Sequence, residues 1–368
     1  MRIYILALGS RGDVELFVAL GSELQRRGHD VVVGTSRFLG SIAKDAGLPW
    51  MPMGDGSEAE FLNLLRGMQS EPDLTARTRQ FGTHWLQPQY AACRAELHRL
   101  LPGFDYFINN LKLVVRRGGR VMPGISVTYD PPLNLADLPK YGPPEKEILD
   151  LVAINRQLID PGNEWDKRYQ FTGFWLRPPA ASRSVSDELR AFVHTARPTV
   201  VLAMGSMVMF DSVQMLQVFE QALQLADCSG VVVAGWSRFR NGAQTSDRIR
   251  CVQEADYDWL FPHASCVVHH GGTGTLAAVL RAGVPSVILP QITCQQRFAE
   301  LLLRESLAVN VFSQDTLSSE ALAAAFVTAQ TCSKTAQAAS TWQAVISAED
   351  GVGRAADLIQ HHWSRVSE

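Results

Sequence analysis

The nine residues VVHHGGTGT at positions 267–275 decide the fold of this chain. Their apolar start predicts a buried strand, and the Gly- and Thr-rich turn after it predicts a helix over residues 276–282. The first N–H groups of a helix have no partner inside the helix, so such a turn is a suitable site for an anion. His270 stands at the entrance of the turn, where it suits a diphosphate better than a purely structural role. The stretch therefore indicates a ligand linked to a nucleotide.

The composition around this stretch is that of an ordinary globular protein with more than one core. A chain of 368 residues is long for a single hydrophobic core and sufficient for two. Hydrophobic residues make up 46% and charged residues 19% of the chain, as is typical of globular domains. The net charge of −3 gives no reason to expect nucleic acid as a partner, because phosphate backbones are bound by basic surfaces.

The sequence indicates neither a targeting segment nor a metal or dinucleotide cofactor. The chain enters a predicted strand at Ile3 without a basic start or cleavage site, and no segment reaches the ~18 apolar residues of a membrane span. The six cysteines have neither CxxC spacing nor Cys/His metal spacing. The spacings of GxGxxG and of a P-loop do not occur. We therefore expect a reduced, cytoplasmic protein without a transmembrane segment.

Strands and helices alternate in both halves of the chain. In the first half we expect strand, helix and strand over residues 3–8, 14–27 and 31–33. In the second half we expect strands over 199–203, 231–234, 266–269 and 286–289, and helices over 213–225 and 276–282. The alternation predicts an α/β fold with two Rossmann-like parallel-sheet domains facing each other across a cleft. Ligands of such sheets bind outside the carboxyl ends of the strands.

A stretch rich in Pro and Ser, RPPAASRS at 177–184, has the composition of a linker. We place the N-terminal domain at 1–176, the linker at 177–186 and the C-terminal domain at 187–368. Residues 54–166 have a less regular pattern that is richer in Pro and Gly, so we expect variable surface loops there.

The two glycine turns at the expected ligand edge differ in charge. GSRGD at 9–13 places Asp13 at a helix start, where a carboxylate would repel a diphosphate, whereas the turn at 270–275 contains no acid. We therefore expect the donor in the second domain and the acceptor in the first. Asp13 has two interpretations. As an N-cap it would stabilise the helix by about 0.5–2 kcal/mol; as a general base it would be kept ionised by the helix N-terminus.

Taken in order, the motifs resemble those of the two-domain GT-B glycosyltransferases of family 1. The resemblance is closest to bacterial enzymes that glycosylate natural products such as glycopeptide antibiotics and macrolides. The matching pieces are GSRGDVE at 9–15, GFW at 173–175, MGSM at 204–207, HHGGTGT at 269–275, RAGVP at 281–285, Pro290 and Gln295. The similarity spans nearly the whole chain, although the first domain looks short.

The resemblance implies an inverting, metal-independent transfer of a sugar from a TDP or UDP donor to a hydroxyl of a small hydrophobic aglycone. Asp13 would be the base that removes the acceptor proton. The donor would be bound by Ser206, Trp236, Val252, Gln253, His270, Gly272, Thr273, Gly274, Thr275, Cys294 and Gln295. Ser10 and Trp85 are candidates for acceptor contact, with helix packing as the alternative for Trp85 and core packing as the alternative for Trp236. The last helix would pack back on the N-terminal domain.

The sequence departs from the family at Cys294, where the family usually has Asp or Glu before Gln295. The family's acid accepts hydrogen bonds from sugar hydroxyls, and a thiol is a poor acceptor. One hypothesis is an atypical, deoxygenated donor sugar, or a sugar held mainly through Gln295. The alternative is a lost contact without a change in specificity.

Two other functions fit the same architecture. One is a nucleotide-sugar epimerase, which would need several acids around the sugar. The other is a non-catalytic auxiliary protein that binds a nucleotide sugar. The identity of the acceptor, the base of the nucleotide, the sugar and the oligomeric state do not follow from the sequence.

Overall fold

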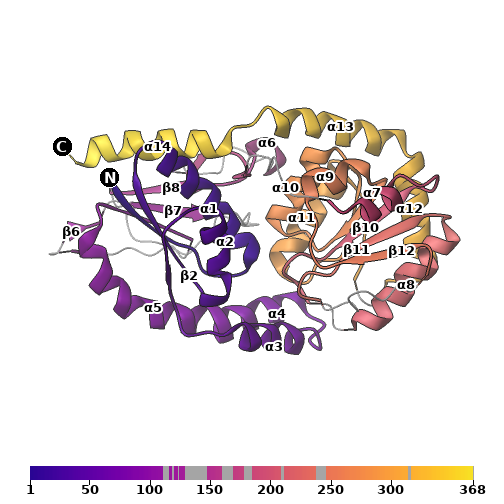
Figure 1. The fold of residues 1–368 in the computed structure, drawn as a ribbon, viewed down its shortest axis with the longest axis horizontal. Coiled ribbons are helices and arrows are strands. Elements are labelled where there is room, and N and C mark those ends of the chain that lie inside the picture. Colours follow the sequence, from indigo (N-terminus) through magenta and orange to yellow (C-terminus); the bar gives the residue numbers. More distant parts are fainter. Residues whose placement is uncertain are drawn as a thin grey trace. The chain divides into compact units, whose positions relative to one another are not determined.

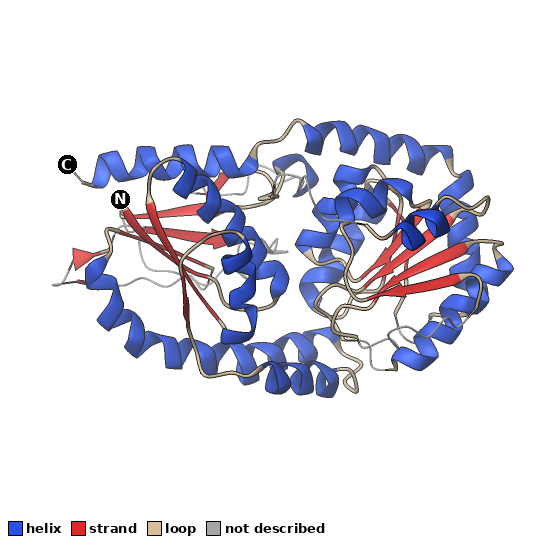
Figure 2. Ribbon diagram, in the orientation of Figure 1, coloured by secondary structure: helices blue, strands red, loops and turns tan. Residues whose placement is uncertain are grey.

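The computed structural model describes residues 1–110, 116–117, 120–122, 124–128, 147–159, 169–177, 185–208, 211–237, 246–313 and 316–367. By its contacts the chain divides into two units. The first unit comprises Met1–Leu64, Arg79–Arg177 and Glu349–Glu368, and the second comprises Leu65–Thr78 and Pro178–Ala348. Each unit contains a parallel sheet accompanied by helices (Figures 1 and 2).

The sheet of the first unit has the strand order β3-β2-β1-β4-β7-β8-β9. These strands are β1 (Arg2–Leu6), β2 (Asp30–Thr35), β3 (Trp50–Pro52), β4 (Tyr106–Asn109), β7 (Gly124–Thr128), β8 (Ile148–Val152) and β9 (Tyr169–Phe171). A separate antiparallel pair is formed by β5 (Arg116–Arg117) and β6 (Arg120–Val121). Because β1 pairs with β2 on one side and β4 on the other, the strand order reverses beside β1. Ligands bind at such a switch point in open α/β sheets.

The helices of the first half begin with α1, which follows β1 directly. They are α1 (Arg11–Arg26), η1 (Arg37–Leu39), α2 (Gly40–Asp45), α3 (Glu58–Met68), α4 (Leu74–Phe81), η2 (Gly82–Leu86), α5 (Gln87–Leu100), η3 (Leu101–Gly103) and α6 (Arg156–Ile159). Gly28 ends the first of these helices with a φ of 86°, as the sequence predicts. The core on one face of the sheet contains Tyr4, Leu6 and Phe107 with residues of α5.

The sheet of the second unit has the order β12-β11-β10-β13-β14-β15, and its strands are all parallel. The strands are β10 (Thr199–Ala203), β11 (Ser229–Val233), β12 (Ile249–Val252), β13 (Cys266–His269), β14 (Ser286–Ile288) and β15 (Ala308–Val311). The helices are α7 (Asp187–Val193), α8 (Ser212–Leu225), α9 (Tyr257–Leu260), η5 (Phe261–His263), α10 (Thr273–Ala282), α11 (Thr293–Arg304), α12 (Ser319–Thr331) and α13 (Ser333–Ser347). The strand order again reverses, between β10 and β13.

The second sheet is buried on both faces because alternate residues of its strands enter different cores. Val200 and Leu202 pack with residues of α8 and α12. Val201 and Ala203, their neighbours in β10, pack with residues of α7, α9 and α10 on the other face. This two-residue alternation explains why the strand reads as a continuous apolar run.

The predicted α/β fold with parallel sheets is confirmed, and the strands at 199–203 and 266–269 have the predicted bounds. The helix predicted from residue 276 begins earlier, at Thr273, because the turn residues are already helical. The loops predicted over 54–166 are wrong in part: α3, α4 and α5 occupy much of residues 58–100. The Pro and Gly content of the region does not exclude helices, because a proline such as Pro88 is tolerated at the start of α5.

The two units are discontinuous in sequence, unlike the continuous domains that we predicted at 1–176 and 187–368. Residues 65–78 belong to the second unit, and the last helix, α14 (Gly351–Val366), belongs to the first. The first unit reaches Arg177, and linker residues 178–184 lie outside the described part of the chain.

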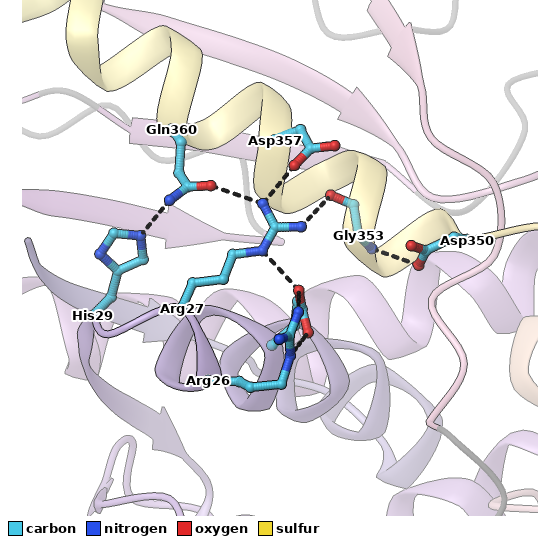
Figure 3. A network of polar contacts seen from close by, with 8 residues as sticks. Arg26, Arg27, His29, Asp350, Gly353, Asp357 and Gln360 are labelled. Carbon is cyan, nitrogen blue, oxygen red and sulfur yellow. Dashed lines mark hydrogen bonds and ion pairs between the residues drawn. The ribbon is translucent and has the colours of Figure 1, made fainter.

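Arg27, at the end of α1, holds α14 against the rest of the first unit (Figure 3). Its guanidinium donates to Asp357 Oδ1 at 2.5 Å, to Gln360 Oε1 at 2.7 Å and to the carbonyl of Gly353 at 3.1 Å. His362 Nδ1 lies 2.5 Å from the hydroxyl of Tyr106, in β4. Polar contacts with the end of α1 and with β4 therefore hold the last helix against the rest of this unit.

Candidate functional site

The loops after β10, β11 and β12 interlock at the carboxyl edge of the second sheet. Gly235 donates its N–H to the carbonyl of Gln253 at 3.1 Å, and Gln253 Nε2 donates back to the carbonyl of Gly235 at 2.7 Å. Ser237 Oγ donates to the carbonyl of Met207 at 2.9 Å. Ser206, Trp236 and Val252 lie in or beside these loops and are partly exposed. Four of the predicted donor-binding residues, Ser206, Trp236, Val252 and Gln253, are thus gathered at one edge.

The turn after β13 reaches the same edge through His270. Gly205, in the loop after β10, has a φ of 55°, and a Cβ built there would lie 2.7 Å from His270 Cε1 and 3.4 Å from Thr275 Oγ1. A Cβ at Gly272 would clash with Nε2 of the same imidazole. Glycine is therefore needed at both positions to make room for the His270 ring.

The two neighbouring histidines have different roles. His269 Nδ1 accepts the N–H of Gly271 at 3.1 Å, so its proton lies on Nε2, 3.2 Å from Ser286 Oγ. These contacts fix the turn onto the neighbouring strand. The motif predicted a role only for His270, although the place of His269 at the end of a buried strand is a signal for a structural role.

His270 is buried, and its Nδ1 has no hydrogen-bond partner among the described residues. Burial lowers the pKa of His270 to about 4, and it lowers the pKa of His269 to about 3. Both rings are therefore neutral near pH 7. A neutral His270 can donate a hydrogen bond to an anion but cannot supply a full positive charge.

The positive potential at this edge comes from the start of α10. Its N-cap is Gly272, which has no side chain to accept hydrogen bonds from the first turn. The first intrahelical bond runs from the N–H of Leu276 to the carbonyl of Gly272 at 2.9 Å. Thr273, Gly274 and Thr275 form this turn, so their backbone N–H groups lie at the positive end of the helix. Such a helix start is suited to an anion, and the anion site stays a prediction.

The start of α11 packs on the same turn. A Cβ at Gly271 would lie 3.1 Å from the carbonyl oxygen of Gln295, which is 4% exposed. The side-chain Oε1 of Gln295 accepts the N–H of Gln291 at 2.8 Å. Cys294, beside it, is partly exposed. The two residues predicted to contact the sugar therefore lie next to the α10 turn.

In the first unit, the structure corrects the position of Asp13. The N-cap of α1 is Ser10, and Asp13 is the third residue of the helix. The carboxylate of Asp13 accepts the N–H of Ser10, which is the contact of a capping-box acid. Gly9, with a φ of 135°, leaves space for this carboxylate, because a Cβ there would clash with it. Asp13 is therefore not the N-cap of α1; it caps the helix as the acid of the capping box.

Trp85 lies in η2 and is 4% exposed. Its ring packs edge-on against Phe61, with centroids 4.7 Å apart, and against Phe38 at 6.2 Å. This environment fits the packing alternative. Ser10 is partly exposed at the start of α1.

The described residues contain no group of three or more His, Cys, Asp or Glu side chains arranged to hold a metal ion. Within the same part of the chain, no helix has the length and apolar character required to cross a membrane.

The sequence matches two family models. Residues 3–88 match the N-terminal domain of glycosyltransferase family 28, a different family number from the one compared above. Residues 223–348 match the C-terminal domain of the erythromycin biosynthesis protein CIII-like family.

Curated relatives include two kinds of glycosyltransferase. O-mycaminosyltylonolide 6-deoxyallosyltransferase of Streptomyces fradiae is 27% identical over 431 residues, which cover 100% of this chain and 98% of the relative. Sterol 3-beta-glucosyltransferase UGT80B1 of Arabidopsis thaliana is 23% identical, over 79% of this chain and 56% of that longer protein.

Solved structures share the fold over the whole chain. The calicheamicin glycosyltransferase CalG4 has a TM-score of 0.72 and 19% identity, covering 100% of both chains. The glycosyltransferase VinC in complex with DTDP has a TM-score of 0.71 and 17% identity, covering 99% of this chain and 100% of that chain. The solved structures show that this chain has the GT-B fold. The two matched domains and the full-length relative show that it is a glycosyltransferase, which resembles the bacterial enzymes of natural-product biosynthesis.

Proposed function

We propose that the chain transfers a sugar from a TDP or UDP donor to a hydroxyl of a small hydrophobic natural product. The transfer inverts the anomeric carbon, requires no metal and uses Asp13 as the base. The observation that carries the donor half is the start of α10, a helix without a side-chain cap beside the buried Nδ1 of His270.

In this proposal the α10 turn stabilises the departing nucleoside diphosphate. Negative charge grows on the leaving oxygen as the glycosidic bond forms, and preorganised N–H groups at a helix start stabilise such charge. The hydroxyls of Thr273 and Thr275 and the neutral ring of His270 are further hydrogen-bond donors at the same place. This set of donors is our reason for proposing a mechanism without a metal, and a chelator such as EDTA should leave the rate unchanged.

The names of similar proteins support the choice of substrates. VinC, which has this fold, was solved with DTDP, which favours TDP as the nucleotide. The Streptomyces relative is named for transferring a 6-deoxyallosyl group. A deoxygenated sugar agrees with Cys294 replacing a carboxylate that would accept hydrogen bonds from hydroxyls. Changing Cys294 to Asp should shift the preference toward more hydroxylated sugars, and an unchanged donor profile would refute this part.

Asp13 would remove the acceptor proton as the new bond forms. Its place at the start of α1 favours the ionised form that a general base requires. The hydrogen bond from Ser10 fixes the direction of the carboxylate. A capping role and a catalytic role are therefore compatible in one side chain.

Thermal-shift measurements with TDP, UDP and GDP test the donor site most directly. A nucleotide at 100 times its dissociation constant should stabilise the protein by about 2.7 kcal/mol. The His270→Ala variant should lose most of this shift, whereas Asp13→Asn should keep it and lose turnover. If no nucleotide shifts the wild-type protein, the proposal is wrong. If nucleotides bind but no acceptor is glycosylated, an auxiliary binding role replaces it, and a nucleotide sugar isomerised without an acceptor would indicate an epimerase.

A further inference from the structure

The first turn of α11 has no capping side chain of its own. Its N-cap is Ile292, whose hydrocarbon side chain cannot accept a hydrogen bond. In the same unit, α8, α9 and α12 are capped by side chains of their N-cap residues, which are Asp211, Asp256 and Ser318. A first turn without such a cap needs an acceptor from elsewhere.

Thr78 supplies this acceptor from a segment more than 200 residues earlier in the sequence. Thr293 donates its N–H to Thr78 Oγ1 at 3.0 Å. Thr78 Oγ1 lies 3.0 Å from Thr293 Oγ1 and 2.8 Å from the carbonyl oxygen of Leu74, and its single proton serves only one of these contacts at a time. Both Thr78 and Thr293 belong to the second unit, because the segment Leu65–Thr78 is part of it. Thr78 thus accepts the N–H of the first residue of α11, whereas the N-cap side chains of the neighbouring helices accept from the second or third residue.

The helical turn of α4 that contains Thr78 is itself held in place by hydrogen bonds. Arg77, next to it in α4, is buried and donates to the carbonyls of Gln69 and Glu71, in the connection between α3 and α4. Asp73 Oδ1 accepts the N–H of Thr75 at 2.8 Å at the start of α4. The position of the Thr78 hydroxyl is therefore defined by a fixed turn and not by a loose loop.

The same turn of α11 carries Cys294 and Gln295, which lie beside the α10 start. It is held from one side by the bond between Gln295 and Gln291, and from the other by Thr78. We propose that Thr78 is a positioning residue for the donor sugar, acting through the first turn of α11. This inference rests on the proposed function, because it assumes that the sugar lies against Cys294 and Gln295.

The test compares Thr78→Val, which removes the hydroxyl and keeps the shape, with Thr78→Ser, which keeps the hydroxyl. Thr75→Val is the matched control, since it makes the same change one helical turn earlier in α4. Amide hydrogen exchange of a peptide covering residues 289–298 reports on the cap. Dissociation constants for TDP and for TDP-glucose, measured by calorimetry, separate contacts with the sugar from contacts with the nucleotide.

We expect Thr78→Val to speed exchange in this peptide and to weaken TDP-glucose about fivefold, the effect of losing one cap. Binding of TDP should change less than about twofold, and Thr78→Ser and Thr75→Val should resemble the wild type. Unchanged exchange would overturn the capping contact. Faster exchange with equal effects on both nucleotides, or none, would overturn the positioning role. A wild-type protein that binds neither nucleotide would reject the proposed function, before any variant is measured.

Discussion

The starts of α1 and α10 follow the same kind of strand and turn but have opposite chemistry. The start of α1 is capped from within, since the Ser10 side chain accepts the N–H of Asp13 and the Asp13 carboxylate accepts the N–H of Ser10. The start of α10 has Gly272 as its N-cap, with no side chain to accept from the first turn. In a capped helix start, the first N–H groups bind a side chain of the protein and stabilise the fold. In an uncapped start, the same groups can bind an anionic ligand. The contrast between the two helices is therefore the structural basis of our proposal that the donor binds to the second unit.

The largest effect should come from neutralising the acid of α1. Asp13→Asn keeps an oxygen that can accept from Ser10, so the helix start should survive. Turnover should fall by about a thousandfold, because a positioned general base contributes about 10²–10⁴. Binding of TDP should stay at the wild-type value, which isothermal calorimetry can measure. Glu15→Gln, a matched loss of charge at a residue paired with Arg11, is the control. Normal turnover by Asp13→Asn would leave this carboxylate with its capping role alone.

The second prediction gives the α10 start an acid like that of α1. A Cβ at Gly274 meets no described atom within 4 Å, so Gly274→Asp should fit. Two like charges about 6 Å apart repel by about 3 kcal/mol at an effective dielectric of 20, so TDP should bind about a hundredfold more weakly. Stability should rise by about 0.3–1 kcal/mol, because the carboxylate favours the helix N-terminus.

Gly274→Asn, which has the same shape without the charge, separates repulsion from crowding. It should retain most of the affinity for TDP. Equal losses in the Asp and Asn variants would mean that the side chain blocks the site and that the charge contrast between the two helix starts does not decide binding.

The third prediction concerns the histidine pair that precedes α10 and has no counterpart before α1. Burial lowers the folded-state pKa of His270 to about 4 and of His269 to about 3, below the ordinary value of 6.5. Between those values and 6.5 the unfolded chain binds more protons. The stabilisation is therefore complete above about pH 6.5 and declines as the pH falls toward the folded pKa values.

For His270 alone, the loss should reach about 2 kcal/mol between about pH 7.5 and pH 5. Urea unfolding of the wild type and of His270→Gln over this range measures it, and the variant should lose about half of the pH dependence. His361→Gln, at an exposed position of α14, is the control. Parallel curves for the wild type and His270→Gln would contradict a buried neutral His270.

The contrast between the two helix starts could be predicted from sequence because it lies in contiguous residues. The acid in GSRGD and its absence from HHGGTGT are visible without a structure. The same holds for β10 and β13, whose apolar runs end at glycine turns. Position within the cap could not be predicted, because Ser10 and Asp13 are both acceptable N-cap residues and only the backbone decides between them.

Long-range contacts left no signal in the sequence. Nothing near Thr78 indicates that it meets Thr293, and nothing near residues 65–78 indicates that they join the second unit. The hydrogen-bond partners of His269 also required the structure, because Ser286 lies on the neighbouring strand, β14. Helix α5 was missed because loops were predicted from the Pro and Gly content of the region, although the first turn of a helix tolerates a proline such as Pro88.

The smallest predicted effect is at the other end of α1, where the contrast with α10 continues. Both helices end at a glycine in a left-handed conformation, Gly28 after α1 and Gly283 after α10. Only α1 has Arg27 before its glycine, and Arg27 donates to three groups of α14. The side chain of Arg27 is 17% exposed, and that of Arg26, which pairs with Glu23, is 71% exposed.

Arg27→Met should therefore lower the free energy of unfolding by about 1–2 kcal/mol, because it removes the donor to the partly buried Gln360 side chain and Gly353 carbonyl. Arg26→Met, the same change one residue earlier, should stay within about 0.5 kcal/mol of the wild type. Urea denaturation of both variants measures the difference. Since neither residue touches the α10 turn, binding of TDP should be unchanged in both. Equal stabilities for the two variants would mean that the contacts of Arg27 with α14 contribute no more than an exposed ion pair.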